Sequence, residues 1–312
     1  MSTKLIFFGT PDIAAYTLRV LCSVGYNALA VVTQPDKPTG RDRMLTPPPV
    51  KTIARELGIP VFQPVTLKDG VFLEELRRLQ PDVCVVISYG KIFPASFFEI
   101  PPLGFLNVHF SLLPAYRGAS PLPTAIMNGD RESGVTIALL VPKVDSGPIL
   151  AQKRLPIPQE KYYPEIINEY MQKGTELLLE VLPRYVSGGI KPREQDHGQA
   201  TFTKILTRQD GNIDWDRSAE QIFNQIRALN PEPGTWTTFD KATLRILRAS
   251  LLSAAAKDVD KPGRVIRHDG TIAVTTGLGL LALELIQREG KKPIAPDDFA
   301  NGHPDFIGVT LG

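Results

Sequence analysis

The chain has 312 residues, of which 43% are hydrophobic and 22% are charged, and its formal net charge at pH 7 is +2. A chain of this length usually forms two domains of about 100–200 residues each. The nearly balanced charge excludes a protein that holds a polyanion through its overall charge, so any contact with nucleic acid must come from local basic patches. No stretch of about 18 uncharged apolar residues occurs, and the apolar run near Met1 is too short for a signal peptide, so we expect a cytoplasmic protein.

The first half of the chain alternates short apolar runs with amphipathic stretches. The runs that we predict to be strands are residues 5–8, 29–33, 83–88, 103–108 and 135–141. The stretches with apolar residues at helical spacing are residues 14–21, 53–57, 72–79 and 164–187. Strands that alternate with helices predict an α/β fold, with a Rossmann-like, mostly parallel sheet and helices on both of its faces.

The second half has a different pattern. Apolar residues become few around residues 187–200, and we predict a linker at residues 190–207. Beyond it we predict a helix at residues 219–228 and strands at residues 235–239, 244–249, 263–266, 271–275 and 280–286. Short strands joined by glycine and proline turns are typical of a small β-rich domain, such as an OB-like barrel. We therefore expect a catalytic domain at residues 1–189 and a C-terminal domain at residues 208–312.

The two cysteines, Cys22 and Cys84, lie far apart in the sequence and in apolar surroundings. A disulfide framework needs more cysteines, and a metal site needs clustered ligands. The four histidines add no metal-ligand spacing to these two cysteines. We expect two reduced thiols and no bound metal.

The strongest chemical signal lies at the end of the predicted strand at residues 103–108. Asn107 and His109 are two residues apart, so strand geometry places both side chains on the same face. An amide and an imidazole in that position are costly in a core unless both are satisfied, which favours a functional site. Asp145 follows a later strand in an Asp-Ser-Gly turn, where aspartate is often only a turn former. Its spacing alone does not decide between a turn-forming residue and a functional one.

Motifs around these residues resemble the signature of the formyltransferases that use 10-formyltetrahydrofolate. The central ones are Asn107-x-His109-x-Ser-Leu-Leu-Pro, Gly134-Val-Thr and Asp145-x-Gly147. Further matches resemble the branch of this family that acts on methionyl initiator tRNA: Phe8-Gly-Thr-Pro, Thr33-Gln-Pro-Asp, Ser88-Tyr-Gly, Gly211-x-Ile-Asp-Trp, Arg227-Ala-Leu-Asn-Pro and Gly290-Lys-Lys-Pro. They run through nearly the whole chain. Phe110 departs from the pattern, because many relatives have a small residue there.

The resemblance implies roles that the chemistry of formyl transfer requires. An amine attacks the formyl carbon, negative charge develops on the formyl oxygen, and the folate nitrogen leaves. The Asn107 amide can donate a hydrogen bond to that oxygen. His109 can hold a proton near neutrality. Asp145 can orient the imidazole.

The resemblance also implies two binding regions. The folate co-substrate needs an apolar slot with backbone hydrogen bonds at its rim, although the residues concerned would otherwise be read as ordinary core and loop. The implied folate-binding residues are Ser88, Tyr89, Gly90, Ile92, Ser111, Leu112, Leu113 and Pro114. Two basic stretches, residues 37–51 and 241–267, are candidates for contacts with tRNA. We expect these contacts from Lys37, Arg41, Arg43, Lys204, Arg245 and Arg248.

Two alternative functions remain open at this point. A formyltransferase of the same fold that acts on a small amine, such as an amino-sugar nucleotide or a purine precursor, would share Asn107, His109 and Asp145. A nucleic-acid-binding protein with an inactive enzyme domain would have no reason to keep this costly arrangement. We expect residues 37–51, rich in proline and glycine, to form neither helix nor strand, and we expect the protein to be a monomer.

Overall fold

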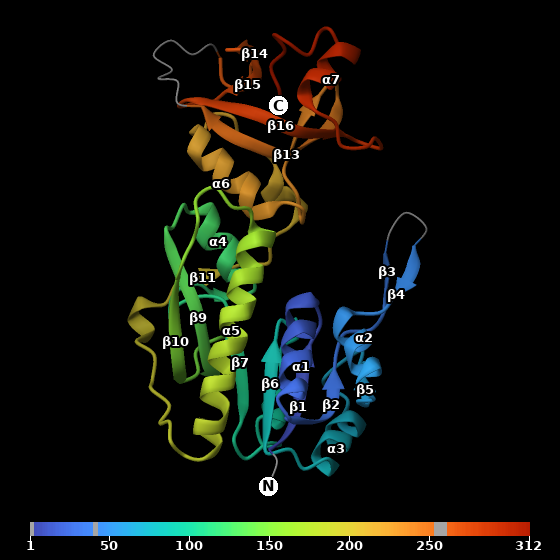
Figure 1. The fold of residues 1–312 in the computed structure, drawn as a ribbon, viewed down its shortest axis with the longest axis vertical. Helices are drawn as coiled ribbons and strands as arrows, with labels where there is room; N and C mark the ends of the chain where they lie inside the picture. Colours follow the sequence, from blue (N-terminus) through green and yellow to red (C-terminus); the bar gives the residue numbers. More distant parts are fainter. Residues whose placement is uncertain (1–2, 40–42, 253–260) are drawn as a thin grey trace. The chain divides into compact units, whose positions relative to one another are not determined.

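The computed structural model describes residues 3–39, 43–252 and 261–312, and its fold is shown in Figure 1. These described residues divide into two compact units. The first unit comprises those within Met1–Pro121, Glu132–Pro156 and Ile167–Thr203, and the second comprises those within Leu122–Arg131, Ile157–Ile166 and Lys204–Gly312. Within the three described ranges, no helix is long and apolar enough to cross a membrane.

The first unit is built on a seven-stranded sheet in the order β10-β9-β7-β6-β1-β2-β5. The strands are β1 (Lys4–Gly9), β2 (Asn27–Val32), β5 (Val61–Phe62), β6 (Val83–Ile87), β7 (Phe105–His109), β9 (Glu132–Leu139) and β10 (Ile149–Pro156). Pairing is parallel from β7 to β5 and antiparallel on both sides of β9. All five residues of β6 are buried, as expected for a strand covered on both faces. The predicted mostly parallel sheet is confirmed.

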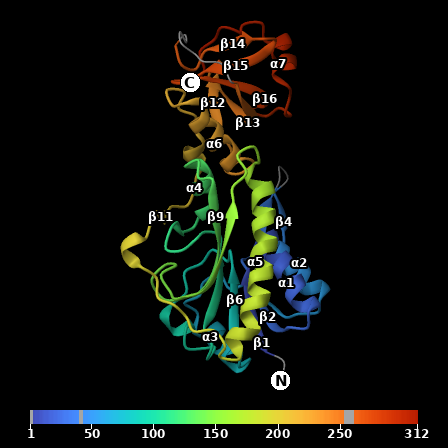
Figure 2. The same ribbon diagram turned by 60° about the vertical axis from the view of Figure 1, so that its left-hand side comes forward.

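Helices cover both faces of this sheet, as Figures 1 and 2 show. The helices are α1 (Asp12–Ser23), α2 (Pro49–Glu56), α3 (Gly70–Arg78) and α5 (Tyr163–Val186). The hydroxyls of Thr17 in α1 and Thr175 in α5 lie 2.8 Å apart, so these two helices share a face. Phe72 of α3 and Phe105 of β7 belong to one hydrophobic core cluster. Because Asn107 is two residues from Phe105, it lies on that side of β7, opposite α5.

A β-hairpin occupies part of residues 37–51, where the prediction of neither helix nor strand was wrong. Strands β3 (Lys37–Thr39) and β4 (Met44–Thr46) pair antiparallel, and α2 begins at Pro49. In a two-stranded ribbon both strands are edges, so the missing N–H of Pro38, which lies opposite Leu45, need not interrupt a ladder. Arg41, one of the expected tRNA contacts, lies outside the described residues.

The segment after α5, expected to be a linker, packs partly on the first unit. Arg193 forms an antiparallel bridge with Ile149 of β10. Strand β11 (Phe202–Thr203) then pairs in parallel with β8 (Arg117–Gly118), which follows β7 in the chain. Figures 1 and 2 show this yellow segment running beside β10 before it reaches β11. Between these contacts lie the short helix η2 (His197–Gln199) and the buried Gln195.

The second unit contains a five-stranded antiparallel sheet in the order β12-β13-β16-β15-β14. Its strands are β12 (Trp236–Phe239), β13 (Ala242–Leu252), β14 (Val265–His268), β15 (Thr271–Thr275) and β16 (Leu280–Arg288). Its helices are α6 (Ala219–Leu229) and α7 (Pro296–Gly302), and α4 (Pro121–Met127) lies mostly within it. Ile222 and Ile226 of α6 join Leu244 and Ile246 of β13 in one hydrophobic core.

The C-terminal residues connect the two edge strands of this sheet. The N–H of Val265 in β14 donates to the carbonyl of Val309 (2.8 Å), and the N–H of Gly312 donates to the carbonyl of Thr238 in β12 (3.2 Å). The tail therefore bridges both edges of the curled sheet. The expectation of a small β-rich, barrel-like domain is confirmed.

Candidate active site

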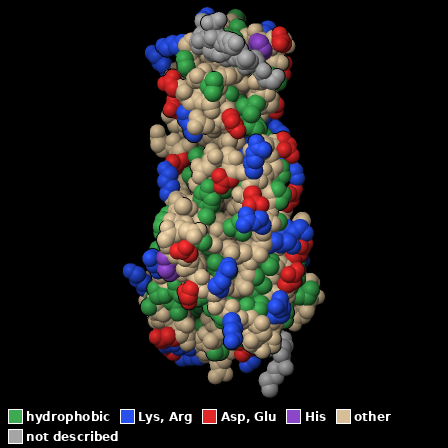
Figure 3. Space-filling model, turned by 90° about the vertical axis from the view of Figure 1, so that its left-hand side faces the viewer, with side chains coloured by type: hydrophobic (Ala, Val, Ile, Leu, Met, Phe, Trp, Pro, Cys, Tyr) green, Lys and Arg blue, Asp and Glu red, His purple; other side chains and the backbone are tan. Residues whose placement is uncertain are grey.

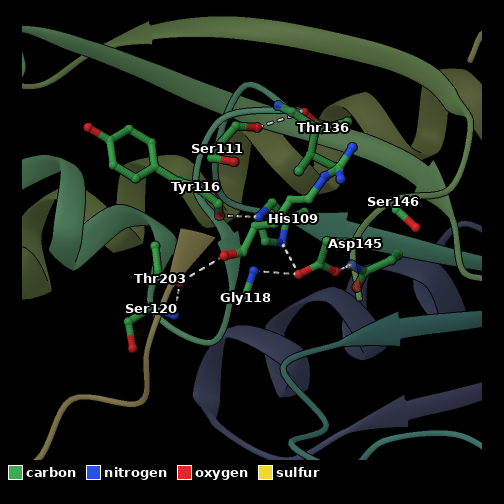
Figure 4. Close-up of polar contacts among 12 residues, drawn as sticks. His109, Ser111, Tyr116, Gly118, Ser120, Thr136, Asp145, Ser146 and Thr203 are labelled. Atoms are coloured by element: carbon green, nitrogen blue, oxygen red, sulfur yellow. Dashed lines mark hydrogen bonds and ion pairs between the residues drawn. The ribbon is translucent and has the colours of Figure 1, made fainter. Parts of the chain in front are cut away.

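The structure brings together Asn107, His109 and Asp145, the three residues expected to form a catalytic site. Figure 4 shows His109 and Asp145 facing each other. Asn107 Nδ2 donates to Asp145 Oδ1 at 3.3 Å, and Asp145 Oδ2 lies 3.7 Å from His109 Nδ1. Both side chains of β7 therefore point to the same side, toward one carboxylate. Asp145 contributes from the turn between β9 and β10.

The turn that carries Asp145 has a constrained backbone. Asp145 has φ +45°, in the left-handed region that aspartate adopts more readily than most residues. A Cβ on Gly147 would lie 1.9 Å from the carbonyl oxygen of Leu139, so only glycine fits there. The N–H of Gly118 donates to Asp145 Oδ2 at 2.8 Å. Backbone geometry, rather than side-chain flexibility, thus fixes the position of the carboxylate.

The imidazole of His109 faces an acceptor on each side. Its Nε2 lies 3.0 Å from the carbonyl oxygen of Tyr116, and because a carbonyl can only accept, Nε2 carries the hydrogen. Its Nδ1 faces the carboxylate of Asp145. When the ring also carries a proton on Nδ1, that carboxylate can accept from it. His109 is only 5% exposed, and its ring is held between the Tyr116 carbonyl and the Asp145 carboxylate.

Phe110 lies away from the three converging side chains. A Cβ on Gly174 of α5 would lie 3.2 Å from Val108 and 3.6 Å from the ring of Phe110. Phe110 therefore packs on the α5 side of β7, whereas Asn107 and His109 face the other side. Its departure from the family pattern changes the packing under α5 rather than the surroundings of Asp145.

The loop at residues 111–114 is held by two side chains. Thr136 belongs to the motif Gly134-Val-Thr, to which the sequence assigned no role, and Gln152 was missed. Thr136 Oγ1 donates to the carbonyl of Ser111 (2.6 Å) and accepts from the N–H of Leu113 (3.1 Å). Gln152 Nε2 donates to the carbonyl of Leu113 at 2.8 Å. Ser111 and Leu113 are buried, whereas Leu112 and Pro114 are half-buried.

The other expected folate residues follow β6, so they lie at the same carboxyl edge of the parallel sheet as the loop after β7. Ser88 and Gly90 are exposed, and Ile92 is 80% exposed. Tyr89 is buried, and burial raises the pKa of its hydroxyl. Its carbonyl accepts a hydrogen bond from Gln34 Nε2 at 2.9 Å, which anchors the segment.

In the first basic stretch, Lys37 and Arg43 are exposed on the hairpin. Lys51 is buried, and its Nζ lies 2.7 Å from Asp36 Oδ1, so it adds no exposed charge to this stretch. Hydrogen bonds from Gln63 and Lys51 lower the pKa of Asp36. The basic surface of this stretch is smaller than the sequence suggested.

In the second unit, Arg245 lines a pocket of about 320 Å³ together with Arg208, Trp236 and Arg288. Of these four, only Arg245 was expected from the sequence. The guanidinium of Arg208 lies 5.7 Å from the centre of the Trp236 ring. Arg245 Nη2 donates to the carbonyl of Pro231 at 2.8 Å. The three guanidinium groups outnumber the one carboxylate that lines this pocket, that of Glu289, so the pocket is suited to an anion.

The remaining basic candidates have partners within the second unit. Lys204 forms an ion pair with Asp210. Arg248 lies over the ring of Tyr162, 5.0 Å from its centre. Residues 253–260, including Lys257, lie outside the described part of the chain. On the face shown in Figure 3, lysines and arginines are interspersed with acidic residues.

Cys22 and Cys84 are both free, as expected. The part of the chain that the structure describes has no group of three or more His, Cys, Asp or Glu side chains that could hold a metal ion. The candidate site consists of the amide of Asn107, the imidazole of His109 and the carboxylate of Asp145.

Comparison with known proteins identifies this combination of fold and site. The formyl transferase family model matches residues 3–182, and the model of the formyl transferase C-terminal domain matches residues 205–304. The α/β unit with Asn107, His109 and Asp145 at the end of its central strands is thus that of a formyl transferase.

Relatives of similar length narrow the class further. The methionyl-tRNA formyltransferase of Roseiflexus castenholzii is 44% identical, with 100% of each chain covered. That of Chloroflexus aggregans is 46% identical, with 94% of each chain covered. The chain therefore belongs to the methionyl-tRNA formyltransferase family. Among solved structures, HypX from Aquifex aeolicus in complex with tetrahydrofolic acid shares the fold, with a TM-score of 0.69 and 16% identity over 98% of this chain and 48% of that one.

Proposed function

We propose that this protein transfers the formyl group of 10-formyltetrahydrofolate to the α-amino group of methionyl initiator tRNA. The products are N-formylmethionyl-tRNA and tetrahydrofolate, for use in translation initiation. The observation that carries this proposal is the convergence of Asn107, His109 and Asp145 in a chain 44% identical, over its whole length, to a methionyl-tRNA formyltransferase.

The three side chains divide the chemical work. The amine forms a bond to the formyl carbon, and the bond from that carbon to the folate nitrogen then breaks. The Asn107 amide nitrogen carries two hydrogens, so it can donate to Asp145 and also to the oxygen that becomes negative. The attacking amine loses one proton and the leaving nitrogen gains one. We assign this proton to Nδ1 of His109, because its Nε2 is held by the carbonyl of Tyr116. Asp145 holds the imidazole and stabilises it while it carries that proton.

The folate co-substrate fits at the carboxyl edge of β6 and β7. Ser88, Gly90 and Ile92 are exposed there, and their backbone groups can form the polar rim of a pterin slot. Leu112 and Pro114 contribute apolar surface from the neighbouring loop. The other three candidates, which are buried, shape the slot from behind rather than line it: Tyr89, Ser111 and Leu113.

Two separate regions contact the tRNA in this proposal. Lys37 and Arg43 of the hairpin, together with Arg41, which lies outside the described residues, meet the acceptor end. Arginine suits this end because it binds both phosphates and base edges. The pocket at Arg245 takes a backbone phosphate. We also propose that residues 1–189 act as the catalytic domain and residues 208–312 as the tRNA-binding domain, in a cytoplasmic monomer.

Transfer of a labelled formyl group tests the proposed function. The purified protein is incubated with formyl-labelled 10-formyltetrahydrofolate and either methionyl initiator tRNA or a panel of amino-sugar nucleotides and purine precursors. We expect label on the tRNA in an alkali-labile ester-linked formylmethionine, and labelling at least about 10²-fold slower with the His109→Ala variant. Label on a small amine but not on tRNA would instead establish the alternative function.

A further inference from the structure

The buried side chain of Gln195 connects the turn that carries Asp145 to the loop that faces His109. It is 6% exposed. Its Nε2 donates to the carbonyls of Asp145 (2.9 Å) and Gly147 (2.6 Å). Its Oε1 accepts from Arg117, at 3.2 Å from Nε and 2.7 Å from Nη2. Both amide hydrogens and both oxygen lone pairs are engaged, and a flipped amide would place donor against donor and acceptor against acceptor.

The amide nitrogen of Gln195 stabilises the turn that carries the Asp145 carboxylate. Asp145 adopts a left-handed backbone, and Gly147 lies against the carbonyl of Leu139 with no room for a side chain. Such a conformation persists only where surrounding groups hold it. The two hydrogen bonds from Gln195 fix the carbonyls on either side of this turn. They therefore set the direction in which the Asp145 side chain leaves the backbone.

The amide oxygen of Gln195 stabilises the loop that faces His109, through Arg117. Arg117 is 1% exposed and lies between Tyr116, whose carbonyl accepts from His109, and Gly118, whose N–H donates to Asp145. Its guanidinium also donates to His197 Nδ1 at 2.8 Å. Arg117 is thus a buried cation whose side-chain acceptors, Gln195 and His197, carry no negative charge. Removing one of these acceptors would leave part of the guanidinium buried without a hydrogen bond, which is costly. Loss of Gln195 would therefore release the loop on the imidazole side as well.

Residues after Gln195 strengthen the same loop. The N–H of Arg117 donates to the carbonyl of Thr201 (2.8 Å), and Thr203 Oγ1 donates to the carbonyl of Arg117 (3.1 Å). Figure 4 shows Thr203 beside Gly118 and Ser120. A Cβ on Gly118 would lie 2.5 Å from the carbonyl oxygen of Thr203, so the two strands are in close contact. The segment from Gln195 to Thr203 is thus part of the frame of the site.

We propose that Gln195 is a positioning residue for formyl transfer: it contacts neither substrate and acts by holding Asp145 in line with His109 and Asn107. This inference rests on the proposed function. A small displacement of a group in the reacting geometry can cost about 10²-fold in rate, so Gln195→Met should lower kcat by about 10- to 100-fold. KM for folate and for tRNA should stay within about twofold, because the binding surfaces are untouched.

The chain offers a matched control in Gln159 of the second unit. Its Nε2 donates to the carbonyls of Asp130 (3.2 Å) and Ile157 (2.7 Å), and its Oε1 accepts from Arg227 (3.4 Å). Gln159→Met removes the same kinds of bond without touching the candidate active site. It should lower the melting temperature but leave kcat within about twofold of the wild type. An equal loss of kcat in both variants would overturn the proposal, because the effect would then be one of general stability.

Two further measurements separate positioning from folding. Gln195→Glu keeps an acceptor for Arg117 but loses the donors to Asp145 and Gly147, so it should fold and still lose at least about 10-fold in kcat. In an Asp145→Asn background, Gln195→Met should cost less in kcat than it does alone, because the residue through which it mainly acts is already disabled. Wild-type kcat in the Glu variant, or a full additional loss in the double variant, would contradict the proposal. The turnover of the unaltered protein with methionyl-tRNA is measured in the same series. That measurement tests the proposed function independently of the role of Gln195.

Discussion

The candidate active site and the pocket at Arg245 use polar side chains in opposite ways. At the active site, His109 is 5% exposed. Asp145 accepts hydrogen bonds from the Asn107 amide and the Gly118 N–H, and its turn has room only for glycine at position 147. In the pocket, Arg208 is exposed and Arg245 is half-buried. The buried active site fixes the positions of the reacting groups, whereas the more exposed pocket offers positive charge to a bound phosphate. Changes in the first should therefore affect turnover, and changes in the second should affect affinity.

The largest effect should come from His109→Ala. Removing a group that carries a proton in the transition state typically costs about 10²–10⁴-fold, and we expect that loss in kcat. KM for methionyl-tRNA should change by less than about twofold. Steady-state kinetics with varied tRNA would measure both. A variant with an altered KM and a normal kcat would move His109 from the chemistry to binding.

Asn107→Ala should have the next largest effect. Loss of one donor to a developing oxyanion typically costs about 10²–10³-fold in kcat. The variant should fold normally, because Asn107 is only half-buried and its bond to Asp145 is long, at 3.3 Å. Kinetics combined with thermal melting would check both points. If more than half of wild-type turnover remained, Asn107 would have no part in the mechanism.

A smaller and different effect should follow from Arg208→Ala combined with Arg245→Ala. We expect weaker binding of tRNA and a log–log salt slope reduced by about 0.9 for each phosphate that the variant no longer neutralises, with kcat at saturating tRNA unchanged. Binding titrations at several salt concentrations would measure the slope. Arg267→Ala is a suitable control, because Arg267 pairs with Asp297 of the same unit at 2.9 Å, outside the pocket. Equal slopes for the double variant and the wild type would remove the pocket from tRNA binding.

The smallest effect should be that of a metal chelator. An amide, an imidazole and a carboxylate can carry the reaction, so prolonged dialysis against EDTA should leave kcat within about 20% of the untreated value. Activity that fell and returned with added zinc would contradict this expectation.

Local patterns predicted much of the fold and the centre of the candidate site. The buried run at β6 and the period-two placement of Asn107 and His109 follow from strand geometry, which depends on neighbouring residues only. The features that sequence reasoning missed depend on residues distant along the chain. Gln195 meets Arg117 across 78 positions, and its partner carbonyl on Asp145 is 50 positions away.

The pocket and the hairpin were missed for related reasons. Arg208, Trp236 and Arg288 meet only after the second unit has folded, so no spacing in the sequence marks them as a group. Lys51 looked like a surface charge until its pairing with Asp36 was visible. The hairpin was missed because Pro38 argues against a strand, except where both strands of a ribbon are edges.

The separation of catalysis from binding is tested most directly by single-turnover formylation at saturating tRNA and folate. With both substrates bound, affinity no longer limits the rate. Asp145→Asn should remain at least about 10²-fold slower than the wild type, because its defect lies in the chemical step. The Arg208→Ala, Arg245→Ala double variant should reach the wild-type rate. A double variant that stays slow at saturation, or an Asp145→Asn enzyme that recovers, would contradict the account.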